Sequence, residues 1–303
     1  MCNVIIITPL KNEESSLCDV AKSVIRQTIA PKLWVIVDDG STDGSANISR
    51  NLQSRFKWIK GINLPNHPRD ITFHYAYVCC KGFDYAIQYC KTNNIYIDYI
   101  VLLDADTILE VNYLKKIIIE FNNDPKLGIA SGIVHHNING ELKESNFNQN
   151  RPSGTGRVWR KDCFLDTGGY LVEPCPDSIS NVKALSNDWK IKKFRNIVST
   201  ETRQTCSAEG IWQGFKINGV NAYYLNKHPI LILLSFCYYI LNKPHYNGLS
   251  FLYGYLIAAL KRKERILDPE IRDYYGKTRI QEYKKNLMQR LFKSKTCIQR
   301  CDK

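Results

Sequence analysis

Two carboxylates separated by a single residue, Asp104 and Asp106, form the pattern in this sequence best suited to metal chemistry. They follow residues 99–103, an unbroken apolar run that predicts a strand buried on both faces. Ligands of open parallel sheets bind just beyond the carboxyl ends of such strands. The two like charges repel each other, and Mg²⁺ or Mn²⁺ with oxygen ligands would relieve that repulsion. The alternative is a strand followed by a helix near Glu110, with Asp106 as its N-cap.

The elements that must position these carboxylates alternate along the chain. Unbroken apolar runs predict buried strands, and amphipathic spacing predicts helices between them. The expected strands cover residues 4–8, 33–37, 58–62, 99–103 and 127–134, and the expected helices lie around residues 17–25, 48–52, 77–91 and 110–121. Strands that alternate with helices indicate an α/β fold, with a mostly parallel, Rossmann-like sheet flanked by helices.

A second acidic pair, Asp38 and Asp39, follows the strand expected at residues 33–37. The first strand is not followed by a Gly-x-Gly-x-x-Gly fingerprint, and the chain has no Walker-type loop, which disfavours dinucleotide-binding and P-loop proteins. A nucleotide held by carboxylates and a metal is the better hypothesis. A lone loop or core histidine is usually structural, but four histidines are further candidate ligands: His67, His74, His135 and His136.

Charge and cysteine content narrow the class of protein further. The 303 residues carry a net charge of +13, and the last 43 hold 14 Lys and Arg against 6 Asp and Glu, which gives +8 in residues 261–303. Such a tail suggests an anionic partner, either nucleic acid or phospholipid. The 11 cysteines are scattered without a disulfide framework, and the N-terminus does not resemble a targeting peptide. We therefore expect a cytoplasmic protein.

Three ordered motifs resemble those of family 2 glycosyltransferases, which have the GT-A fold and an Asp-x-Asp pair. They are Thr8-Pro9-x-x-Asn12-Glu13-Glu14, Val37-Asp38-Asp39-Gly40-Ser41-Thr42-Asp43 and Leu103-Asp104-Ala105-Asp106, in a match that covers about residues 3–225. The resemblance implies transfer of a sugar from a nucleotide-sugar donor with inversion at the anomeric carbon. The donor-binding positions that it implies are Thr8, Pro9, Glu13, Asp38, Asp39 and Asp104. Asp106 is the expected direct ligand of Mg²⁺ or Mn²⁺, and Asp104 is expected at the metal or the ribose.

The second half of the match implies the acceptor side. Its small-residue turn and Gly-Gly-aromatic segment correspond to Gly154, Thr155, Gly156, Gly168 and Gly169, although ordinary turns are the alternative. An inverting transferase needs one general base to remove the proton of the attacking hydroxyl. By resemblance that base is Asp177, with Asp188 as the alternative, and Pro176 stands where the family usually has Glu. Arg203 is expected either to bind a diphosphate or acceptor phosphate or to be a solvated surface residue.

Two apolar stretches, residues 229–241 and 249–260, characterise the carboxyl-terminal part of the chain. Neither reaches the roughly 20 residues needed to span a bilayer. With a basic cluster at residues 261–265 and a basic amphipathic helix at 279–293, they favour a helical hairpin in an anionic membrane interface. The alternative is that these helices cap the catalytic domain or dimerise. The expected domains are a GT-A catalytic domain at 1–225, with a nucleotide-sugar-binding half (1–107) and an acceptor half (108–225), and a basic, apolar, helical appendage at 226–303.

One function is preferred over two alternatives. We expect a metal-dependent, inverting glycosyltransferase that moves one sugar to a glycan, lipid-linked glycan or polyprenyl phosphate, and that binds peripherally to the cytoplasmic membrane face. Transfer of a single sugar is favoured because the Gln-x-x-Arg-Trp motif of processive relatives is absent from residues 201–212. A sugar nucleotidyltransferase would need a glycine-rich, basic loop after the first strand, which residues 9–14 do not supply. A nucleic-acid-binding protein would need stacking aromatic residues among the tail charges, and the tail has few.

Overall fold

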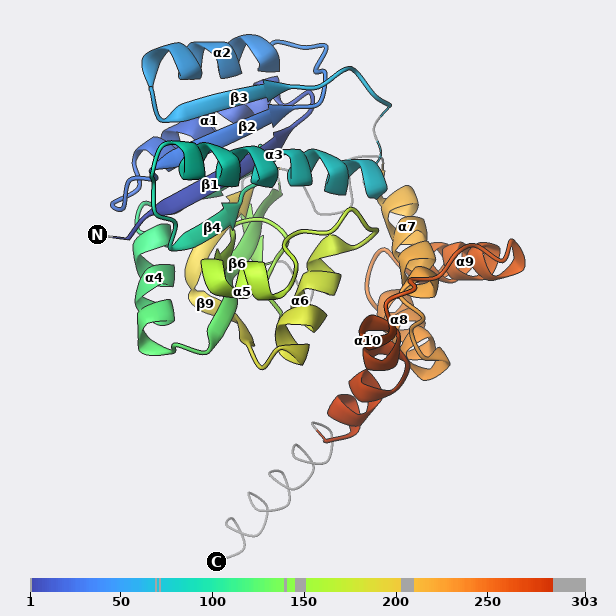
Figure 1. Ribbon diagram of the computed structural model, residues 1–303. Helices are drawn as coiled ribbons and strands as arrows, with labels where there is room; N and C mark the ends of the chain where they lie inside the picture. The colour runs from blue at the N-terminus through green and yellow to red at the C-terminus, as the bar shows by residue number, and fades with distance from the viewer. Residues whose placement is uncertain are drawn as a thin grey trace, which may run out of the picture. The chain divides into compact units, whose positions relative to one another are not determined.

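The computed structural model describes residues 2–68, 70, 72–138, 141–144, 151–202 and 210–285. The chain forms two compact units, Met1–Thr205 and Cys206–Lys303. In Figure 1 the strands and helices α1 to α6 belong to the first unit, and helices α7 to α10 belong to the second. The predicted catalytic domain ended near residue 225, whereas the first unit ends about twenty residues earlier.

Four parallel strands form the first half of the sheet, in the order β3-β2-β1-β4. They are β1 (Val4–Leu10), β2 (Leu33–Asp38), β3 (Ile59–Asn63) and β4 (Tyr99–Leu102). In the central strand, Ile7 lies beside Val35 of β2 and Leu102 of β4. The carboxyl ends of β1, β2 and β4 therefore lie at one edge of the sheet, where the acidic residues follow. The predicted α/β fold is confirmed.

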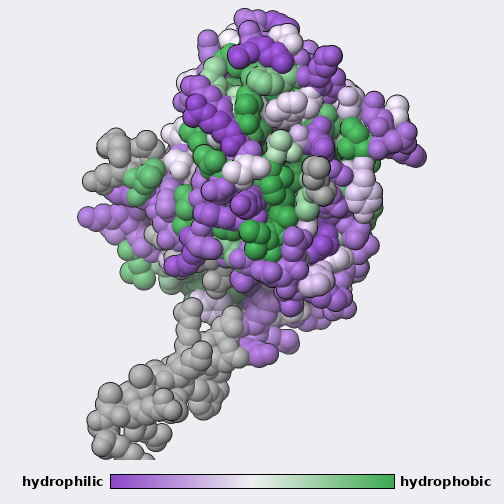
Figure 2. Space-filling view, turned by 90° about the vertical axis from the view of Figure 1, so that its left-hand side faces the viewer, coloured by the Kyte–Doolittle hydropathy of each residue, from purple (hydrophilic) through white to green (hydrophobic). Residues whose placement is uncertain are grey.

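Helices cover both faces of this sheet. One face packs against α1 (Glu14–Ile25), α2 (Ser45–Arg55) and α4 (Tyr113–Asn123), and the other against α3 (Phe73–Thr92), α5 (Lys161–Asp166) and α6 (Pro176–Ser186). Successive side chains of β1 point to opposite faces of the sheet. Val4 and Ile6 therefore pack in the core with α1, α2 and α4, and Ile5 and Ile7 pack in the core with α3, α5 and α6. On the surface seen in Figure 2, hydrophobic residues gather in narrow patches between hydrophilic ones.

The second half of the sheet is mixed. Its strands are β5 (Thr107–Leu109), β6 (Leu127–Ile138), β7 (Glu141–Glu144), β8 (Arg157–Arg160) and β9 (Lys190–Glu201). The strand β8 lies antiparallel between β4 and β6, β9 runs parallel to β6, and β5 pairs antiparallel with β9. Of these strands the apolar pattern of the sequence predicted only β6, and the family resemblance implied a short strand after the turn at residues 154–156, which is β8. The mixed half brings residues 153–157 and 199–202 to the acidic edge, because β8 begins beside the end of β4.

The N-cap interpretation of Asp106 is wrong. Thr107–Leu109 is a strand, and the following helix begins only at Tyr113, with Asn112 as its N-cap residue. The backbone carbonyl of Asp106 accepts a hydrogen bond from the amide of Thr202 at the end of β9. Asp106 therefore lies in the link between two strands, and its carboxylate is not used to start a helix.

The second unit is helical where the structure describes it. Its elements are α7 (Ile211–Tyr224), α8 (Pro229–Leu241), α9 (Tyr246–Leu260), α10 (Pro269–Asp273) and the π-helix η1 (Tyr274–Thr278). A small core of Ala222, Ile232 and Phe251 joins α7, α8 and α9. A Cβ atom on Gly219 would lie 2.0 Å from the Phe251 carbonyl oxygen, so α7 and α9 cross in close contact. This packing places α7 with the carboxyl-terminal helices, whereas the expected catalytic domain, residues 1–225, included it.

The helices α8 and α9 expose many large apolar side chains. Only Ile232 of α8 is buried, while Leu241 and Leu260 are 78% and 82% exposed. The other exposed apolar residues of the two helices are Ile230, Leu233, Leu234, Tyr238, Tyr246, Leu249, Tyr253 and Leu256. Among the described helices, none is both long and apolar enough to cross a membrane. The expected helix at 279–293 lies within the described residues only as far as residue 285.

Candidate active site

Asp104 and Asp106 lie directly beyond β4, and both are partly exposed, whereas Ala105 between them is buried. Strand-like alternation explains this arrangement, since side chains at positions i and i+2 leave the backbone on the same side. The amide of Asp104 donates to Thr155 Oγ1 at 3.0 Å, and that hydroxyl donates to Thr107 Oγ1 at 2.9 Å. Thr155 thus fixes the backbone on which both carboxylates stand.

The Asp104 carboxyl group lies in strongly negative surroundings. Burial, followed by the charge of Asp106, raises its pKa to about 7, and the charges of Asp177 and Glu13 add to the effect. The hydroxyl of Tyr75 in α3 donates to Asp104 Oδ1 at 2.8 Å and lowers that pKa. Burial and the Asp104 charge hold the pKa of Tyr75 well above its usual value, so the tyrosine is a neutral donor. These residues form one electrostatically coupled cluster with surplus negative charge.

The donor set of this cluster fits a hard divalent cation. A cation between Asp104 and Asp106 would offset the charge that raises the Asp104 pKa. Within the described part of the chain, no group of three or more His, Cys, Asp or Glu residues is arranged to hold a metal. The described residues therefore offer two carboxylates and not a complete cage. Mg²⁺ and Mn²⁺ suit such a site, because Mg²⁺ in particular is usually held by one or two carboxylates together with water and substrate phosphates.

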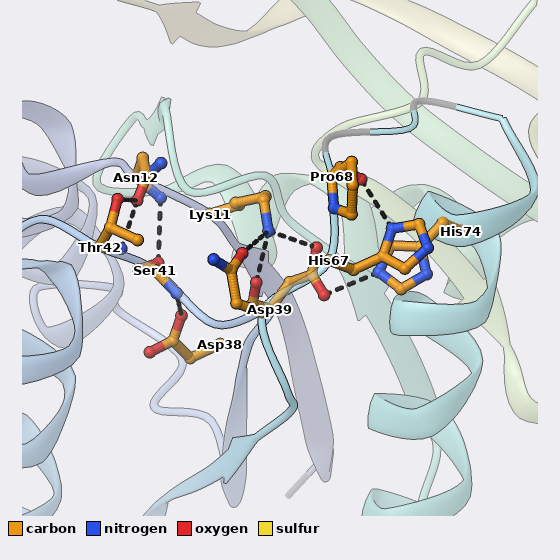
Figure 3. Close-up of polar contacts among 10 residues, drawn as sticks. Lys11, Asn12, Asp38, Asp39, Ser41, Thr42, His67, Pro68 and His74 are labelled. Atoms are coloured by element: carbon orange, nitrogen blue, oxygen red, sulfur yellow. Dashed lines mark hydrogen bonds and ion pairs between the residues drawn. The ribbon is translucent and has the colours of Figure 1, made fainter.

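The Asp39 carboxylate, at the end of β2, is held between two nitrogen donors. Lys11 Nζ lies 3.1 Å from Asp39 Oδ2, and His74 Nε2 lies 2.7 Å from Oδ1, so that the two donors approach from opposite sides (Figure 3). The His67 ring stacks on His74 with ring centroids 3.7 Å apart. The side chain of Asp39 is 6% exposed and those of Lys11 and His74 are 15% and 16% exposed, so only the edge of a ligand could reach this group.

The loop after β1 is tied to the turn after β2. Asn12 has a φ of 54°, its amide donates to Ser41 Oγ, and its side-chain oxygen accepts from the Thr42 amide (Figure 3). Asp38 accepts from the Ser41 amide at 2.9 Å and is 3% exposed. Asp38 therefore shapes the turn, an Asx-type role, and Asp39 is the residue of this pair beside Lys11 and His74.

Three residues that were expected to bind the nucleotide-sugar donor lie in or against the protein's own structure. They are Thr8, Pro9 and Glu13. The hydroxyl of Thr8 is fully buried and accepts from Trp34 Nε1 at 2.9 Å, and Pro9 lies within β1. Glu13 is 7% exposed and accepts from the Ser16 hydroxyl at 3.2 Å, although its charge still acts on Asp104. The side chain of Thr8 is therefore part of the core and not a surface available to a ligand.

The acceptor-side glycines lie against the Asp177 carboxylate or in tight turns. A Cβ atom on Gly154 would be 2.7 Å from Asp177 Oδ2, so this position has no room for a side chain in the observed arrangement. Gly156 has a φ of +60°, and its carbonyl accepts from the buried Tyr113 hydroxyl. Gly168 and Gly169 have φ of +77° and +78°; their amides donate to carbonyls of α5, so they end that helix.

Asp177 stands in the first turn of α6 and is partly buried. Pro176 begins this helix, at a position where proline is favoured because its missing N–H is not needed. The Tyr170 hydroxyl donates to Asp177 Oδ1 at 3.1 Å, directly after the turn formed by Gly168 and Gly169. Burial and the Asp177 charge raise the pKa of Tyr170 well above its usual value. Asp177 therefore accepts from the buried, neutral Tyr170 and Asp104 from the partly buried, neutral Tyr75, and the two carboxyl groups interact electrostatically with each other.

Comparison with known proteins assigns the chain to a family. A model described as Glycosyl transferase family 2 matches residues 5–171, which is more than half of the chain. The chain belongs to glycosyl transferase family 2. Poly-beta-1,6-N-acetyl-D-glucosamine synthase of Staphylococcus epidermidis is 23% identical over 227 residues, 67% of this chain and 50% of that protein. The chain thus spans about half the length of the curated relatives it matches.

Solved structures of low sequence identity share the GT-A fold of the family. The mannosyltransferase PcManGT from Pyrobaculum calidifontis, in complex with GDP-Man and Mn²⁺, has a TM-score of 0.53 at 13% identity over 86% of this chain and 88% of its own. S. aureus TarS 1–349 has a TM-score of 0.50 at 15% identity over 86% of this chain and 72% of its own. The predicted fold and family are both confirmed.

The structure separates Asp188 from the other candidate residues of this family 2 site. Asp188 is exposed in the turn after α6, with a φ of 60°, at the opposite end of the helix from Asp177. An eleven-residue helix is about 16 Å long. His136 pairs with Glu201 at 3.3 Å on β6 and β9, and Arg203 lies outside the described residues. The sequence does not reveal Tyr75, Lys11 or the role of Tyr170, because only tertiary packing brings these residues to the acids.

Proposed function

We propose that this family 2 protein is a metal-dependent, inverting glycosyltransferase that moves one sugar from a nucleotide-sugar donor to an acceptor hydroxyl. The observation that carries the proposal is the convergence of Asp104, Asp106 and Asp177 at the carboxyl edge of a GT-A sheet. Two of these carboxylates suit a cation with a diphosphate, and the third has the partial exposure that a general base needs. The structures of PcManGT and GalNAc-T7, both solved with Mn²⁺, support a divalent cation.

Each group has a distinct chemical task in this proposal. Asp39 holds the base or ribose of the donor, and Asp104 and Asp106 hold the diphosphate end together with Mg²⁺ or Mn²⁺. A cation held by Asp104 and Asp106 would offset the charge that develops on the departing diphosphate. Asp177 Oδ2 lies beside the backbone of Gly154, which carries no side chain. This oxygen accepts the proton of the attacking acceptor hydroxyl. Tyr170 fixes the other oxygen of the same carboxylate, which orients Asp177 for this step.

The acceptor is proposed to be a glycan, a lipid-linked glycan or a polyprenyl phosphate at an anionic, cytoplasmic membrane face. The many exposed apolar side chains of α8 and α9 support this location, because a surface rich in exposed apolar residues commonly marks a protein or membrane interaction site. Lys261, Arg262, Lys263 and Arg265 follow α9 directly and would face anionic headgroups. Transfer of one sugar is preferred over polymerisation, because the sequence lacks the processive Gln-x-x-Arg-Trp motif.

A donor screen tests the enzymatic proposal. The full chain is incubated with UDP-, GDP- and dTDP-sugars and Mn²⁺ in the presence of candidate acceptors, and release of the nucleoside diphosphate is measured together with the glycosylated product. We expect one donor class to give product with wild type, and Asp106→Asn or Asp177→Asn to reduce turnover by at least about 100-fold with an unchanged melting temperature. Transfer retained by either variant would reject the role assigned to that carboxylate.

A further inference from the structure

Arg157, the first residue of β8, is a fully buried arginine beside the proposed general base. Its guanidinium donates to Asn181 Oδ1 at 2.6 Å, to the Asp177 carbonyl at 3.2 Å and to the Ser153 carbonyl at 3.4 Å. The guanidinium also lies 4.8 Å from the ring centroid of Trp159. Isolated charges are rarely buried in this way, because desolvation costs several kcal/mol, on the order of the stabilisation from a good ion pair.

The partners of Arg157 belong to the two segments that flank the Asp177 carboxylate. Asp177 and Asn181 lie on the first two turns of α6, and Ser153 directly precedes Gly154, whose Cβ position is 2.7 Å from Asp177 Oδ2. One planar group therefore ties the start of the helix to the acceptor-side turn. The distance between Asp177 and the backbone of Gly154 depends on this connection.

The electrostatics of Arg157 point to the same carboxylate. Its hydrogen-bond acceptors are neutral oxygens, and its Nε atom is buried without a hydrogen-bond partner among the described residues. Burial lowers the pKa of Arg157, and the charge of Asp177 is the largest influence that opposes the effect. Arg157 is thus a fully buried positive charge, hydrogen-bonded to the Asp177 backbone and close enough for the two charges to interact, in a site that also holds Asp104 and Asp106.

We propose that Arg157 is a positioning residue for sugar transfer, which holds Asp177 at the acceptor-side turn and stabilises its negative charge. The inference rests on the proposed function, because it assigns Asp177 the task of accepting the acceptor proton. None of the hydrogen bonds of Arg157 involves Asp39, Asp104 or Asp106. Loss of Arg157 should therefore impair attack by the acceptor and leave donor binding unchanged.

Arg160 on the same strand provides a matched control. Its guanidinium also donates to backbone carbonyls, those of Leu127, Phe121 and Asp124, and lies 5.4 Å from an aromatic ring centroid. Arg160 thus contacts β6, α4 and the loop that joins them, and none of these contacts involves a candidate catalytic residue. Arg160→Met therefore removes a similar structural arginine without changing the surroundings of Asp177.

The experiment compares full-length wild type, Arg157→Met, Arg157→Lys and Arg160→Met, using the donor that the screen identifies. We expect Arg157→Met to lower kcat about 100-fold with donor KM within twofold, and Arg160→Met to retain kcat per folded molecule even if its melting temperature falls. Arg157→Lys should recover part of the loss, since lysine restores the charge but not the planar fork. Equal kcat values for Arg157→Met and Arg160→Met would overturn the proposal.

A second variant keeps the test decisive if Arg157→Met does not fold. Asn181→Ala removes the 2.6 Å acceptor of Arg157 from α6 and leaves the arginine in place. The expected result is a three- to tenfold fall in kcat with unchanged donor KM, and an unchanged kcat would reject the positioning role. Absence of transfer by wild type with every donor would instead reject the proposed function, so the two failures are distinguishable.

Discussion

Tyr75 donates its hydroxyl hydrogen to Asp104 across 2.8 Å, and the residue before it, His74, lies 2.7 Å from Asp39. Two consecutive residues in the first turn of α3 therefore contact the acidic ends of two strands, β4 and β2, that flank the central strand β1. This turn fixes the spacing between the carboxylate proposed for the base or ribose and the one proposed for the diphosphate. Changes in this turn should alter donor use without unfolding the sheet.

Substitution of Tyr75 by Phe should shift the pH dependence of transfer. The Tyr75 hydroxyl lowers the Asp104 pKa, so its loss should raise that pKa and move the acidic limb of the kcat/KM profile to higher pH. A hydrogen bond to a charged group contributes roughly 1.5–3 kcal/mol, which corresponds to a shift of about one to two pH units. Tyr99→Phe, whose hydroxyl contacts Asn122 and not the site, should leave the profile unmoved. Identical profiles for both variants would contradict this role of Tyr75.

Metal-free protein should lose stability through Asp104 as the pH rises. The folded pKa of about 7 lies above the unfolded value of roughly 3.9, so the folded state binds this proton more tightly. The contribution is fully present below about pH 4 and is lost as the pH rises through 7. Relative to Asp104→Asn, wild type should lose on the order of 2–4 kcal/mol of unfolding free energy between pH 4 and 8, measured by urea denaturation with EDTA present.

Asp124 supplies a control of opposite sign for that experiment. Its contact with Lys190 holds its pKa below the usual value, so its stabilising contribution is present above the unfolded pKa and lost as the pH falls. Wild type should therefore lose its advantage over Asp124→Asn as the pH falls below about 4, so the denaturation series for this pair is extended to lower pH. If wild type and Asp104→Asn have parallel stability curves from pH 4 to 8, the Asp104 pKa is not raised.

Much of this architecture could be predicted from the sequence, because the central strands are unbroken apolar runs. Residues 4–8, 33–37 and 99–103 have no polar alternation, and each ends at loop or acidic residues that mark the ligand edge. The strand β9 could not be predicted in this way. Its exposed face carries several Lys and Arg residues, so the hydrophobic signal of a strand is weak, and β8 has only four residues.

The site was predictable where a residue type alone specifies the chemistry. The Asp104–Asp106 spacing has a direct chemical meaning, but the tasks of Thr8 and Arg157 depend on neighbours distant in the sequence. The Thr8 hydroxyl accepts a hydrogen bond from Trp34. The Arg157 guanidinium donates to residues of α6 and to the turn before β8. No local pattern reveals such partners, since the same residue types are common at exposed positions.

Removal of the metal should abolish transfer and lower thermal stability. With Mn²⁺ and a nucleoside diphosphate present, wild type should melt several degrees higher than in EDTA, because a ligand held by the folded state alone stabilises it. Asp106→Asn should show no such increase, while retaining the melting temperature of metal-free wild type. Differential scanning fluorimetry with and without Mn²⁺ measures both quantities. An equal Mn²⁺-dependent increase in the variant would reject Asp106 as a ligand.

The affinity of a nucleoside diphosphate for the site should depend on the hydrogen-bonding groups that its base presents to Asp39. Asp39 accepts from Lys11 and His74, and its remaining lone pairs suit a base that presents a ring N–H. Uracil, thymine and guanine have that donor, whereas cytosine and adenine have an acceptor ring nitrogen at the same edge and donate only from an exocyclic amino group. UDP, dTDP or GDP should therefore bind at least tenfold more tightly than CDP in isothermal titration calorimetry with Mn²⁺. Asp39→Ala should remove the difference, and tight CDP binding to wild type would contradict it.

The carboxyl-terminal helices should bind anionic lipid through their exposed apolar side chains. Burial of one leucine side chain contributes roughly 1.5–3 kcal/mol, so replacing two should weaken membrane binding by more than tenfold. Leu241→Glu with Leu260→Glu tests this expectation, because both positions are 78% or more exposed and folding should tolerate the changes. The measurement is flotation of the full chain with vesicles that contain phosphatidylglycerol, compared with vesicles of phosphatidylcholine alone.

A matched control separates this effect from a general effect of added charge. Leu142 is 60% exposed on β7 of the catalytic unit, and Leu142→Glu should leave flotation unchanged. Wild type should float with anionic vesicles at low salt and less at high salt, because the basic residues that follow α9 contribute about 1 kcal/mol each near an anionic surface. If wild type and the double variant both stay at the bottom of the gradient, the exposed helices do not bind lipid and the membrane-bound acceptor loses its support.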